Sequence, residues 1–357
     1  MDNNFKFVII GAGVIGLSIA EHLSRYFDNI LVIEKENKFG LHTSSRNSEV
    51  IHSGFYYPNK SLKAQLCVRG NKMIYEFCDK YNIPYKKCGK LIAANNDIEI
   101  NELNKIFTLA KDNGVKNVRI LSKQESIAIE PLIRCKKSLF IPSTGILDSH
   151  LFMSKLENLS ISRDTTILYQ LEVKDISIDN NQYSISFSNE NTKIKAENII
   201  NCAGLWSHRL ANKIVDTPYD IEYYKGDYFK APELKGLNHL IYPVPSQLSL
   251  GIHTVLNLNN EILLGPNAYK VNKIDYSTDD KYKNLFLSQI NKLVTKKVTH
   301  INRDYSGIRP KIKFEDKMND FIINQDRKGL FNLVGIDSPG LTSSLAIAEY
   351  VYNQVNL

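Results

Sequence analysis

The chain has few cysteines, and none of them lies in a pattern that builds a metal site or a disulfide framework. Five cysteines occur in 357 residues, widely spaced and without a Cys-x-x-Cys pair. Zinc sites and small disulfide-bonded scaffolds rely on closely spaced cysteines. The histidines also lack metal-like spacing. We therefore expect no bound metal and a reducing compartment, and we take the cytoplasm as the location.

Long apolar runs are absent as well. A helix that crosses a bilayer needs about 18 consecutive apolar residues, and no such run exists. The first residues carry no basic segment, and the apolar stretch behind them leads straight into a glycine motif. We therefore expect no signal peptide. Peripheral attachment to the inner membrane face stays open.

The net charge of +7 is spread along the chain, without a basic block interleaved with aromatic residues. Nucleic acid is therefore not an expected partner. The content of 43% hydrophobic and 23% charged residues is that of a soluble globular protein. A length of 357 residues allows two domains.

The most informative feature lies at the beginning of the chain. An apolar run at residues 5–10 predicts a buried parallel strand, and Gly11-Ala12-Gly13-Val14-Ile15-Gly16 follows it. In such a motif the first glycine permits a tight turn, the second lets the backbone approach a pyrophosphate, and the third lets the next helix pack close to the sheet. The N–H groups of that helix then face the phosphates. The motif predicts a dinucleotide-binding βαβ unit.

A second apolar run at residues 29–33 ends at Glu34, which lies 34 − 16 = 18 positions after Gly16. A carboxylate at this place accepts the hydroxyl groups of the adenosine ribose. It also repels a 2′-phosphate, so NADP is disfavoured. Strand, glycines, helix, second strand and acid arrive in the order that a nucleotide site requires.

Further elements follow from the spacing of apolar residues and from turn signals. We expect the last strand and helix to complete the nucleotide domain, which would make this domain discontinuous. The predicted helices are 61–82, 97–114, 280–295 and 342–354; the predicted strands are 89–94, 138–141, a meander through 171–173, 183–187 and 196–200, several within 220–266, and 330–335.

The predicted fold class is α/β (α+β overall), with a Rossmann-type domain that binds the dinucleotide (the FAD-binding domain of the resemblance given below) and a discontinuous substrate domain built on an antiparallel sheet. We assign 1–80, 145–218 and 305–357 to this nucleotide domain. The substrate domain takes 81–144 and 219–304.

Several segments in this order resemble the D-amino-acid-oxidase superfamily of flavoproteins, and within it the L-2-hydroxyglutarate dehydrogenases and oxidases. The resemblance extends over nearly the whole chain. The segments that carry it are 44–57, 61–67, 88–92, 201–207, 226–228, 241–245, 264–268 and 307–310.

The chain departs from the family pattern at two positions and in length. Many members have His in place of Arg46 and Gly in place of Glu49. The run Ser44-Ser45-Arg46 instead resembles FAD-dependent glycerol-3-phosphate dehydrogenases. The C-terminal part is shorter than in longer members. These departures leave the fold as expected and leave the substrate open.

The resemblance implies FAD as the cofactor, and only one nucleotide motif is present, so the substrate itself would reduce the flavin. The turn after the first strand and the loop at 44–47 would hold the pyrophosphate and ribityl chain. Val173 would face the adenine, and the helix beginning at Gly340 would stabilise negative charge on the reduced flavin. The residues assigned to the cofactor are Gly11, Ala12, Gly13, Val14, Ile15, Gly16, Glu34, Lys35, Ser44, Ser45, Arg46, Asn47, His52, Val173, Cys202, Ala203, Gly204, Gly307, Gly340, Leu341, Thr342 and Ser343.

Arg309 is the candidate anchor for a substrate carboxylate. A guanidinium group holds a carboxylate by two parallel hydrogen bonds, and the segment Gly-Ile-Arg-Pro is similar to the one that supplies this arginine in the superfamily. Lys311 lies two residues further on and would point the same way along a strand.

Two histidines compete for the role of general base. An imidazole titrates near neutral pH and can accept a hydroxyl proton. His52 lies in the loop expected beside the flavin, where a hydrogen bond to the flavin, a covalent link to it and a purely structural role are the alternatives. His253 is the rival base, or a ligand for a distal carboxylate. Tyr56, Tyr223 and Tyr242 are candidates for lining the substrate pocket.

We interpret the chain as an enzyme that takes L-2-hydroxyglutarate to 2-oxoglutarate by hydride transfer to flavin N5. Reoxidation would use a quinone, another carrier or oxygen. Glycerol 3-phosphate and an amino acid, as in glycine oxidase, are the alternative substrates. A flavin-binding module without turnover is the alternative from another class.

Overall fold

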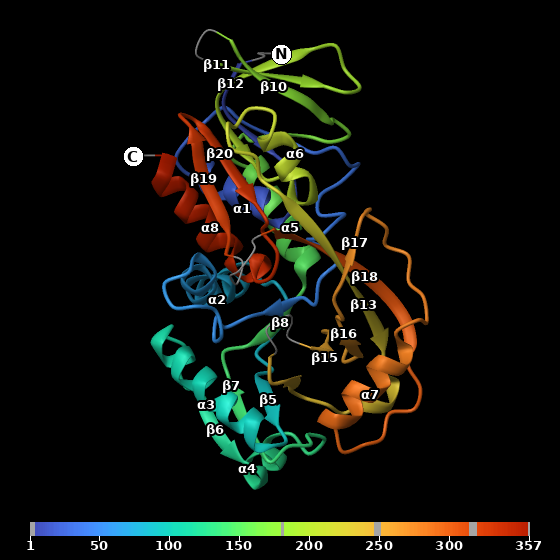
Figure 1. Cartoon of the computed structure of the whole chain (residues 1–357). Helices are drawn as coiled ribbons and strands as arrows, with labels where there is room; N and C mark the ends of the chain where they lie inside the picture. Colours follow the sequence, from blue (N-terminus) through green and yellow to red (C-terminus); the bar gives the residue numbers. More distant parts are fainter. Residues whose placement is uncertain (1–3, 180–181, 246–250, 314–319, 356–357) are drawn as a thin grey trace. The chain divides into compact units, whose positions relative to one another are not determined.

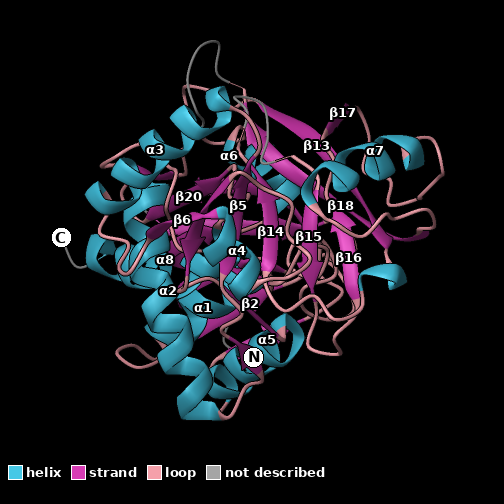
Figure 2. Cartoon of the chain, turned by 90° about the horizontal axis from the view of Figure 1, so that it is seen from below, coloured by secondary structure: helices cyan, strands magenta, loops and turns pink. Residues whose placement is uncertain are grey.

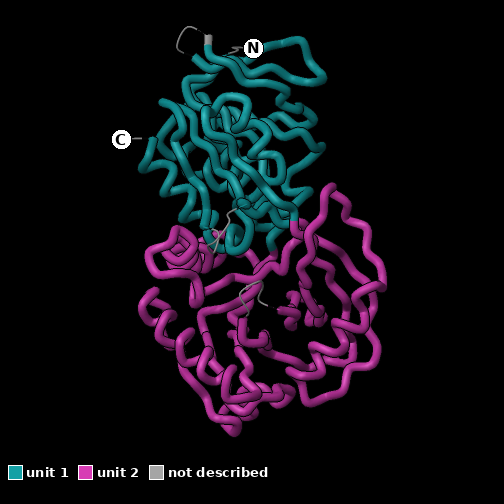
Figure 3. The backbone as a smooth tube through the Cα atoms, viewed as in Figure 1, with its two compact units in different colours: residues 1–45, 149–223, 309–357 teal, residues 46–148, 224–308 magenta. Residues whose placement is uncertain are grey.

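The computed structural model describes residues 4–179, 182–245, 251–313 and 320–355, which fall into two compact units (Figure 3). Unit 1 contains residues 1–45, 149–223 and 309–357, and unit 2 contains 46–148 and 224–308. Both units combine helices with strands; Figure 2 colours the helices and strands of the chain. The chain is therefore of mixed α/β type with a discontinuous first unit.

Unit 1 is built on an eight-stranded sheet. Its parallel part runs β9 (Thr166–Leu168), β2 (Ile30–Ile33), β1 (Asn4–Ile10), β12 (Lys193–Asn201) and β20 (Leu330–Val334). The antiparallel strands β10 (Val173–Asp179) and β11 (Gln182–Phe187) extend it through β12, and β19 (Ile322–Arg327) pairs with β20. The predicted meander and the predicted C-terminal strand are thus confirmed.

Helices α1 (Val14–Leu23) and α6 (Ser207–Ala211) contact strands of this sheet, and further helices pack against α1. Helix α1 contacts both α5 (Ser149–Ile161) and α8 (Gly340–Val355), as Figure 1 shows. Because α1 has neighbours on most sides, even Glu21 is fully buried. Its carboxylate binds Arg25 at 2.6 Å and Arg163 at 3.1 Å, so the buried charge is paired. A short η1 (Gly204–Trp206) and α6 follow β12.

Unit 2 contains three smaller sheets. Strand β5 (Lys90–Ala94) lies between β14 (Leu240–Pro243), parallel to it, and β7 (Lys137–Ile141), antiparallel to it, with β6 (Arg119–Ser122) at the edge. Helices α3 (Asp97–Asp112) and α4 (Lys123–Ile129) pack on this sheet. A second sheet joins β3 (Val50–Ile51), β8 (Gly145–Leu147) and β4 (Tyr85–Lys86).

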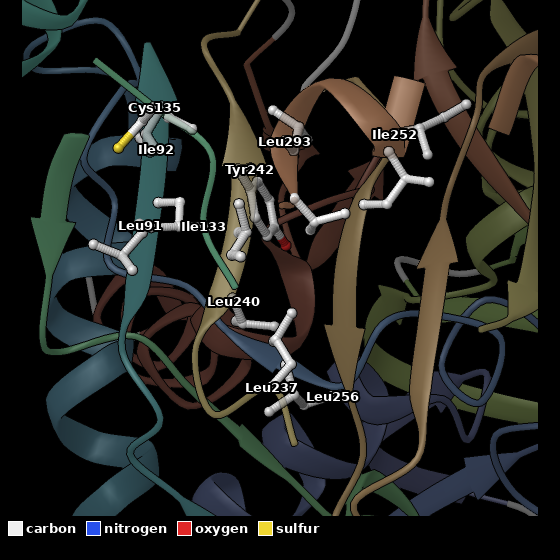
Figure 4. Packing of buried hydrophobic residues seen from close by; sticks show 14 of the residues in the cluster. Leu91, Ile92, Ile133, Cys135, Leu237, Leu240, Tyr242, Ile252, Leu256 and Leu293 are labelled. Carbon is white, nitrogen blue, oxygen red and sulfur yellow. The ribbon is translucent and has the colours of Figure 1, made fainter. Parts of the chain in front are cut away.

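The third sheet has the order β15 (His253–Leu256), β16 (Ile262–Gly265), β13 (Ile221–Lys230) and β17 (Tyr269–Val271), with β18 (Asn302–Ile312) also paired to β13. A large apolar cluster unites these elements with α7 (Lys283–Leu293) and contains Leu91, Ile92, Leu240 and Tyr242 (Figure 4). Helix α2 (Leu62–Tyr81) and the turn η2 (Pro232–Leu234) complete the unit.

The compact units and the domains assigned from sequence differ mainly at residues 46–80. Sequence places this segment in the FAD-binding domain, whereas it packs with unit 2. The reason is the pairing of β3 with β8 and the contact of α2 with the neighbouring loop, where Asn71 donates to the carbonyl oxygens of His52 and Ser143. This packing shows that residues 46–80 share the core of unit 2. It does not determine which ligand the segment binds.

Candidate functional site

Unit 1 brings together residues 11–16, Glu34, Ser44 and Cys202, which we call the cradle and treat as the candidate site for a dinucleotide. The backbone leaves β1 at Gly11, whose φ of +107° is a conformation that favours glycine. A Cβ atom at Gly11 would lie 2.5 Å from the Cys202 carbonyl oxygen, and one at Gly16 would lie 1.9 Å from the Gly11 carbonyl oxygen. Neither position can therefore carry a side chain, which is what the motif predicts.

The N-terminus of α1 opens into this cradle. Gly13 is its N-cap residue and has no side chain of its own, and a Cβ there would lie 2.9 Å from Ser44 Oγ. The Val14 N–H donates to Ser44 Oγ at 3.0 Å, so the predicted loop residue does reach the turn. The bare helix end and its dipole suit an anion such as a pyrophosphate.

Glu34 lies at the end of β2, as predicted. One carboxylate oxygen accepts the Ala12 N–H at 2.8 Å and the other accepts the Glu36 N–H at 2.9 Å. These bonds fix the carboxylate at the glycine turn, and each oxygen keeps a lone pair for a ribose hydroxyl. The Leu171 N–H donates to the Glu34 carbonyl, which brings the start of the strand carrying Val173 to the same place.

An aromatic and charged group borders Glu34. The Lys35 ammonium lies 3.2 Å from the centroid of the Trp206 ring, and His42 contacts the same ring at 4.7 Å. The His42 ring also hydrogen-bonds Glu36 at 2.8 Å, and this bond holds the pKa of the Glu36 carboxyl below its usual value. Lys35 is thus held in place by cation–π contact.

Helix α8 begins at the predicted glycine. The Gly340 N–H donates to the Asp337 carbonyl at 2.6 Å and the Ser343 N–H to the Pro339 carbonyl at 3.0 Å. Two of the four N–H groups predicted to face the flavin therefore have carbonyl acceptors. The Ser343 hydroxyl is buried and lacks a hydrogen-bond partner among the described residues. A buried orphan hydroxyl in the first turn fits a polar ligand atom there.

The remaining cofactor candidates are distributed over both units. The Cys202 N–H donates to the Ile10 carbonyl at 2.8 Å, which fixes Cys202 beside the glycine turn. Burial raises the pKa of its thiol, in agreement with a packing role. In unit 2 the Arg46 guanidinium stacks on Tyr276 at 4.1 Å, and a Cβ at Gly307 would lie 2.1 Å from the Arg46 carbonyl oxygen. Arg46 and Gly307 are therefore neighbours.

Unit 2 contains a group of four side chains that we call the histidine cluster: the buried Lys90, Tyr242 and His253 and the half-buried His52. His52 follows the short strand β3, and its carbonyl oxygen accepts the Asn71 amide at 2.8 Å. The next hydroxyl, that of Ser53, bonds Thr144 at 3.1 Å. Helix α2 and the loop before β8 thus hold the backbone of His52.

The other three members stack on one another. The rings of Tyr242 and His253 have centroids 3.6 Å apart and planes inclined by 20°. The Lys90 ammonium lies 3.9 Å from the centroid of the Tyr242 ring. The carbonyl oxygen of Gly251 can only accept, so His253 Nδ1 donates to it at 2.7 Å. In the neutral ring, Nε2 is then the nitrogen that accepts a proton.

Electrostatics within this cluster disfavours positive charge. Desolvation lowers the pKa of His52 well below its ordinary value, and the charges of Lys90 and His253 lower it further. Burial lowers the pKa of Lys90 to about 7, against smaller opposing contributions from the Cys67 and Cys88 thiols. A neutral imidazole is the form that can accept a proton, so the cluster presents His52 as a base.

The predicted pocket residues divide between the units. Tyr56 packs between Phe55 at 5.1 Å and Tyr57 at 4.5 Å in unit 2. Tyr223 donates its hydroxyl to the Leu205 carbonyl at 2.8 Å in unit 1. Arg309 and Lys311 both lie on β18, two positions apart and hence on one face of that strand, in the part of it that belongs to unit 1.

Lys90 is the member of the cluster to which the sequence analysis gave no role. Its position inside the predicted strand 89–94 was the available signal, because a lysine there interrupts an apolar run. The described residues contain no group of three or more His, Cys, Asp or Glu side chains placed to hold a metal ion. Among the helices searched in the described part, none is long and apolar enough for a bilayer crossing.

Comparisons with known proteins identify the family and the fold of this chain. The family model DAO, described as FAD dependent oxidoreductase, matches residues 6–354. The mitochondrial L-2-hydroxyglutarate dehydrogenase of Arabidopsis thaliana is 35% identical over 97% of this chain and 82% of its own length. A glycerol 3-phosphate dehydrogenase of Caloramator mitchellensis is 32% identical over 97% of this chain and 73% of its length.

Among solved structures, the dithionite-reduced L-alpha-glycerophosphate oxidase of Mycoplasma pneumoniae with FAD bound is similar to this chain with a TM-score of 0.88. The identity is 25%, over 99% of this chain and 95% of the other. The predicted fold class is thereby confirmed.

Proposed function

The chain belongs to the DAO family of FAD dependent oxidoreductases, and from this premise we propose that it oxidises L-2-hydroxyglutarate to 2-oxoglutarate. The observation that carries the proposal is the 35% identity, over 97% of the chain, to a protein named L-2-hydroxyglutarate dehydrogenase. FAD is the cofactor of the family, and the glycine turn, Glu34 and the N-terminus of α1 are the residues that fit it.

Bound FAD supplies an acceptor for the hydride that leaves C2 of the substrate. The protein supplies position and proton transfer. Arg309 binds the C1 carboxylate through two parallel hydrogen bonds and so fixes the orientation of C2. Lys311, on the same face of β18, adds a second positive charge for a substrate with two carboxylates.

His52 accepts the proton of the substrate hydroxyl in this proposal. The low pKa of His52 keeps its ring neutral near pH 7, and a neutral ring is required for this step. His253 is the alternative base, because its Nδ1 donates to a carbonyl and Nε2 is then the accepting nitrogen. A quinone, another carrier or oxygen would be the final electron acceptor.

A second candidate substrate is glycerol 3-phosphate. It is favoured by the 32% identity to a glycerol 3-phosphate dehydrogenase and by the run Ser44-Ser45-Arg46. Each of the two substrates carries a secondary hydroxyl group near an anionic group. One cationic anchor would therefore serve either substrate.

The test is an anaerobic titration of the purified yellow holoenzyme, followed by flavin absorbance. We expect L-2-hydroxyglutarate to bleach the flavin, and the D-enantiomer and glycerol 3-phosphate to leave it oxidised. Bleaching by glycerol 3-phosphate alone would assign the second substrate. A flavin that none of these compounds, nor glycine, reduces would favour the binding module without turnover.

Arg309→Ala separates substrate binding from cofactor binding in the same assay. We expect the substrate concentration for half-bleaching to rise strongly while the flavin content stays that of the wild type. Equal losses of both would make the arginine structural.

A further inference from the structure

Lys90 is unusual among the buried lysines of unit 2. Its side chain is 0% exposed, and its Nζ has no hydrogen-bond partner among the described residues. Lys225 is also buried, but its ammonium donates to the Ser277 carbonyl. A buried ammonium without a hydrogen bond is costly unless something else stabilises it. The ammonium of Lys90 must therefore be stabilised by other groups around it.

The surroundings are aromatic. Lys90 and Leu240 are paired across the parallel strands β5 and β14, and Tyr242 pairs with Ile92, so Lys90 and Tyr242 are diagonal neighbours on one face. The ammonium lies 3.9 Å from the Tyr242 centroid and 5.3 Å from the Phe55 centroid. The electron-rich ring faces thus take the place of hydrogen-bond acceptors.

The His253 ring, stacked at 3.6 Å, fills the space over one face of Tyr242. An ammonium at 3.9 Å from the same centroid must therefore lie over the opposite face. Lysine, tyrosine and histidine form three layers, with the phenol ring in the middle. Figure 4 shows this ring among aliphatic side chains. Because Lys90 is fully buried, little solvent screens its charge.

Among the residues that the structure describes, the ionisable groups that interact with Lys90 are Cys67, Cys88, His52 and the Tyr242 phenol, and none of these is a carboxylate. Burial raises the pKa of the Cys88 thiol to about 11 and the pKa of Cys67 further, so both thiols are neutral at physiological pH. Burial likewise keeps the Tyr242 hydroxyl protonated, by raising its pKa.

We propose, building on the function proposed above, that Lys90 is a positioning residue for proton transfer. Its ammonium holds the Tyr242–His253 stack from the opposite face and disfavours a second positive charge on the neighbouring imidazoles, so that His52 remains an acceptor of the substrate proton. Because the ammonium is fully enclosed, it acts through these neighbours and does not touch the substrate.

The test uses holoenzyme labelled with ¹⁵N-histidine and needs no substrate. The ring signals are followed against pH by NMR, and His52→Gln identifies the signal of His52. In Lys90→Met we expect the pKa of His52 to rise by on the order of one unit, since a like charge is removed. Lys225→Met is the matched control and should leave that pKa unchanged.

An unchanged pKa of His52 in Lys90→Met would overturn the proposal. Lys90→Gln, a second neutral variant, gives the same test if the methionine variant does not take up flavin. A rise of equal size in Lys225→Met would also contradict it, because the effect would then come from general loss of charge.

The kinetic counterpart is the acid limb of kcat/KM for L-2-hydroxyglutarate, which should move to higher pH in Lys90→Met by the same amount as the NMR titration. If L-2-hydroxyglutarate is not a substrate, the pH profile of kcat/KM cannot be measured and the proposed function is wrong. The NMR titration of His52 still tests the effect of Lys90 in that case. If the NMR pKa of His52 rises in Lys90→Met but the acid limb of kcat/KM stays at the same pH, Lys90 has no role in proton transfer.

Discussion

The dinucleotide cradle of unit 1 and the histidine cluster of unit 2 are built in different ways. The cradle is a backbone structure: its shape follows from glycines that leave no room for a Cβ atom and from N–H groups that meet the Glu34 carboxylate. The histidine cluster is formed by side chains, and their pKa values depend on burial and on the charges of the neighbouring side chains.

The two also differ in how the chain supplies them. Most of the cradle comes from one segment of about thirty residues, whereas the cluster joins positions 52, 90, 242 and 253, which span 253 − 52 = 201 positions. A local backbone constraint leaves a motif in the sequence. An electrostatic environment assembled from distant strands leaves none, and so the cradle is the more predictable of the two.

The largest effect is expected where the cradle has no space. In Gly16→Val the Cβ would lie 1.9 Å from the Gly11 carbonyl oxygen, so the turn and α1 cannot keep their packing. We expect a protein without flavin, measured as the ratio of absorbance at 450 nm to that at 280 nm.

Gly114→Asn is the control for this variant. Gly114 has a φ of +82°, but an added Cβ meets nothing within 4 Å, and asparagine tolerates this conformation. Full flavin content in Gly16→Val would show that the close approach in the cradle is not required.

The next effect concerns the stability of unit 2. The pKa of Lys90 is about 7 in the folded chain, below its ordinary value of 10.5. The unfolded chain thus binds the proton more strongly, and burial of the charge opposes folding fully below pH 7 and not at all above about pH 10.5. The free energy of unfolding of Lys90→Met should therefore exceed that of the wild type by several kcal/mol at pH 6–7, and the variant should unfold at a higher temperature.

The difference in Tm between Lys90→Met and the wild type should shrink as the pH is raised from 7 towards 10. Thermal unfolding followed by circular dichroism at a series of pH values measures it. A difference that grows with pH would mean that Lys90 is stabilised by a negative charge, and the electrostatic contrast between the two regions would be wrong.

A smaller effect is expected at the edge of the cradle. Glu34→Gln keeps the shape of the side chain but replaces one acceptor oxygen by a donor, which opposes the N–H groups of Ala12 and Glu36. We expect the Kd for FAD to rise about tenfold, or ~1.4 kcal/mol, measured by flavin fluorescence during reconstitution. An unchanged Kd would separate Glu34 from the cofactor.

The smallest effect is expected from Tyr242→Phe. The hydroxyl is buried without a hydrogen-bond partner among the described residues, so its removal relieves an unsatisfied polar group and leaves both stacked faces intact. Stability should stay within about 1 kcal/mol of the wild type or rise. A rise in KM for the substrate would instead assign the hydroxyl to substrate binding.

Sequence reasoning found the elements whose pattern is local. The strand before the glycines, the helix 61–82 and the C-terminal strand and helix correspond to β1, α2, β20 and α8. It missed α5 (Ser149–Ile161), which packs against α1, because this helix shows no strong separation of polar and apolar faces. It placed Arg309 and Lys311 on a strand without giving the bounds of that strand, which in the structure is β18 (Asn302–Ile312).

Within the candidate site, the glycines, Glu34 and Ser44 could be placed from the sequence because each meets the backbone of a neighbouring turn. His52, His253 and Tyr242 could be selected by residue type alone. The stacking of Tyr242 on His253, and the lysine over its other face, depend on the pairing of β5 with β14, which no local pattern specifies.

The central claim is that unit 1 holds the cofactor and the histidine cluster moves the proton. Its most direct test is His52→Gln, with flavin content and the rate of anaerobic flavin reduction by L-2-hydroxyglutarate measured on one sample. We predict full flavin content and a rate lower by about 10²-fold or more, the usual contribution of a general base. A variant reduced as fast as the wild type, or one that lost its flavin instead, would contradict the claim.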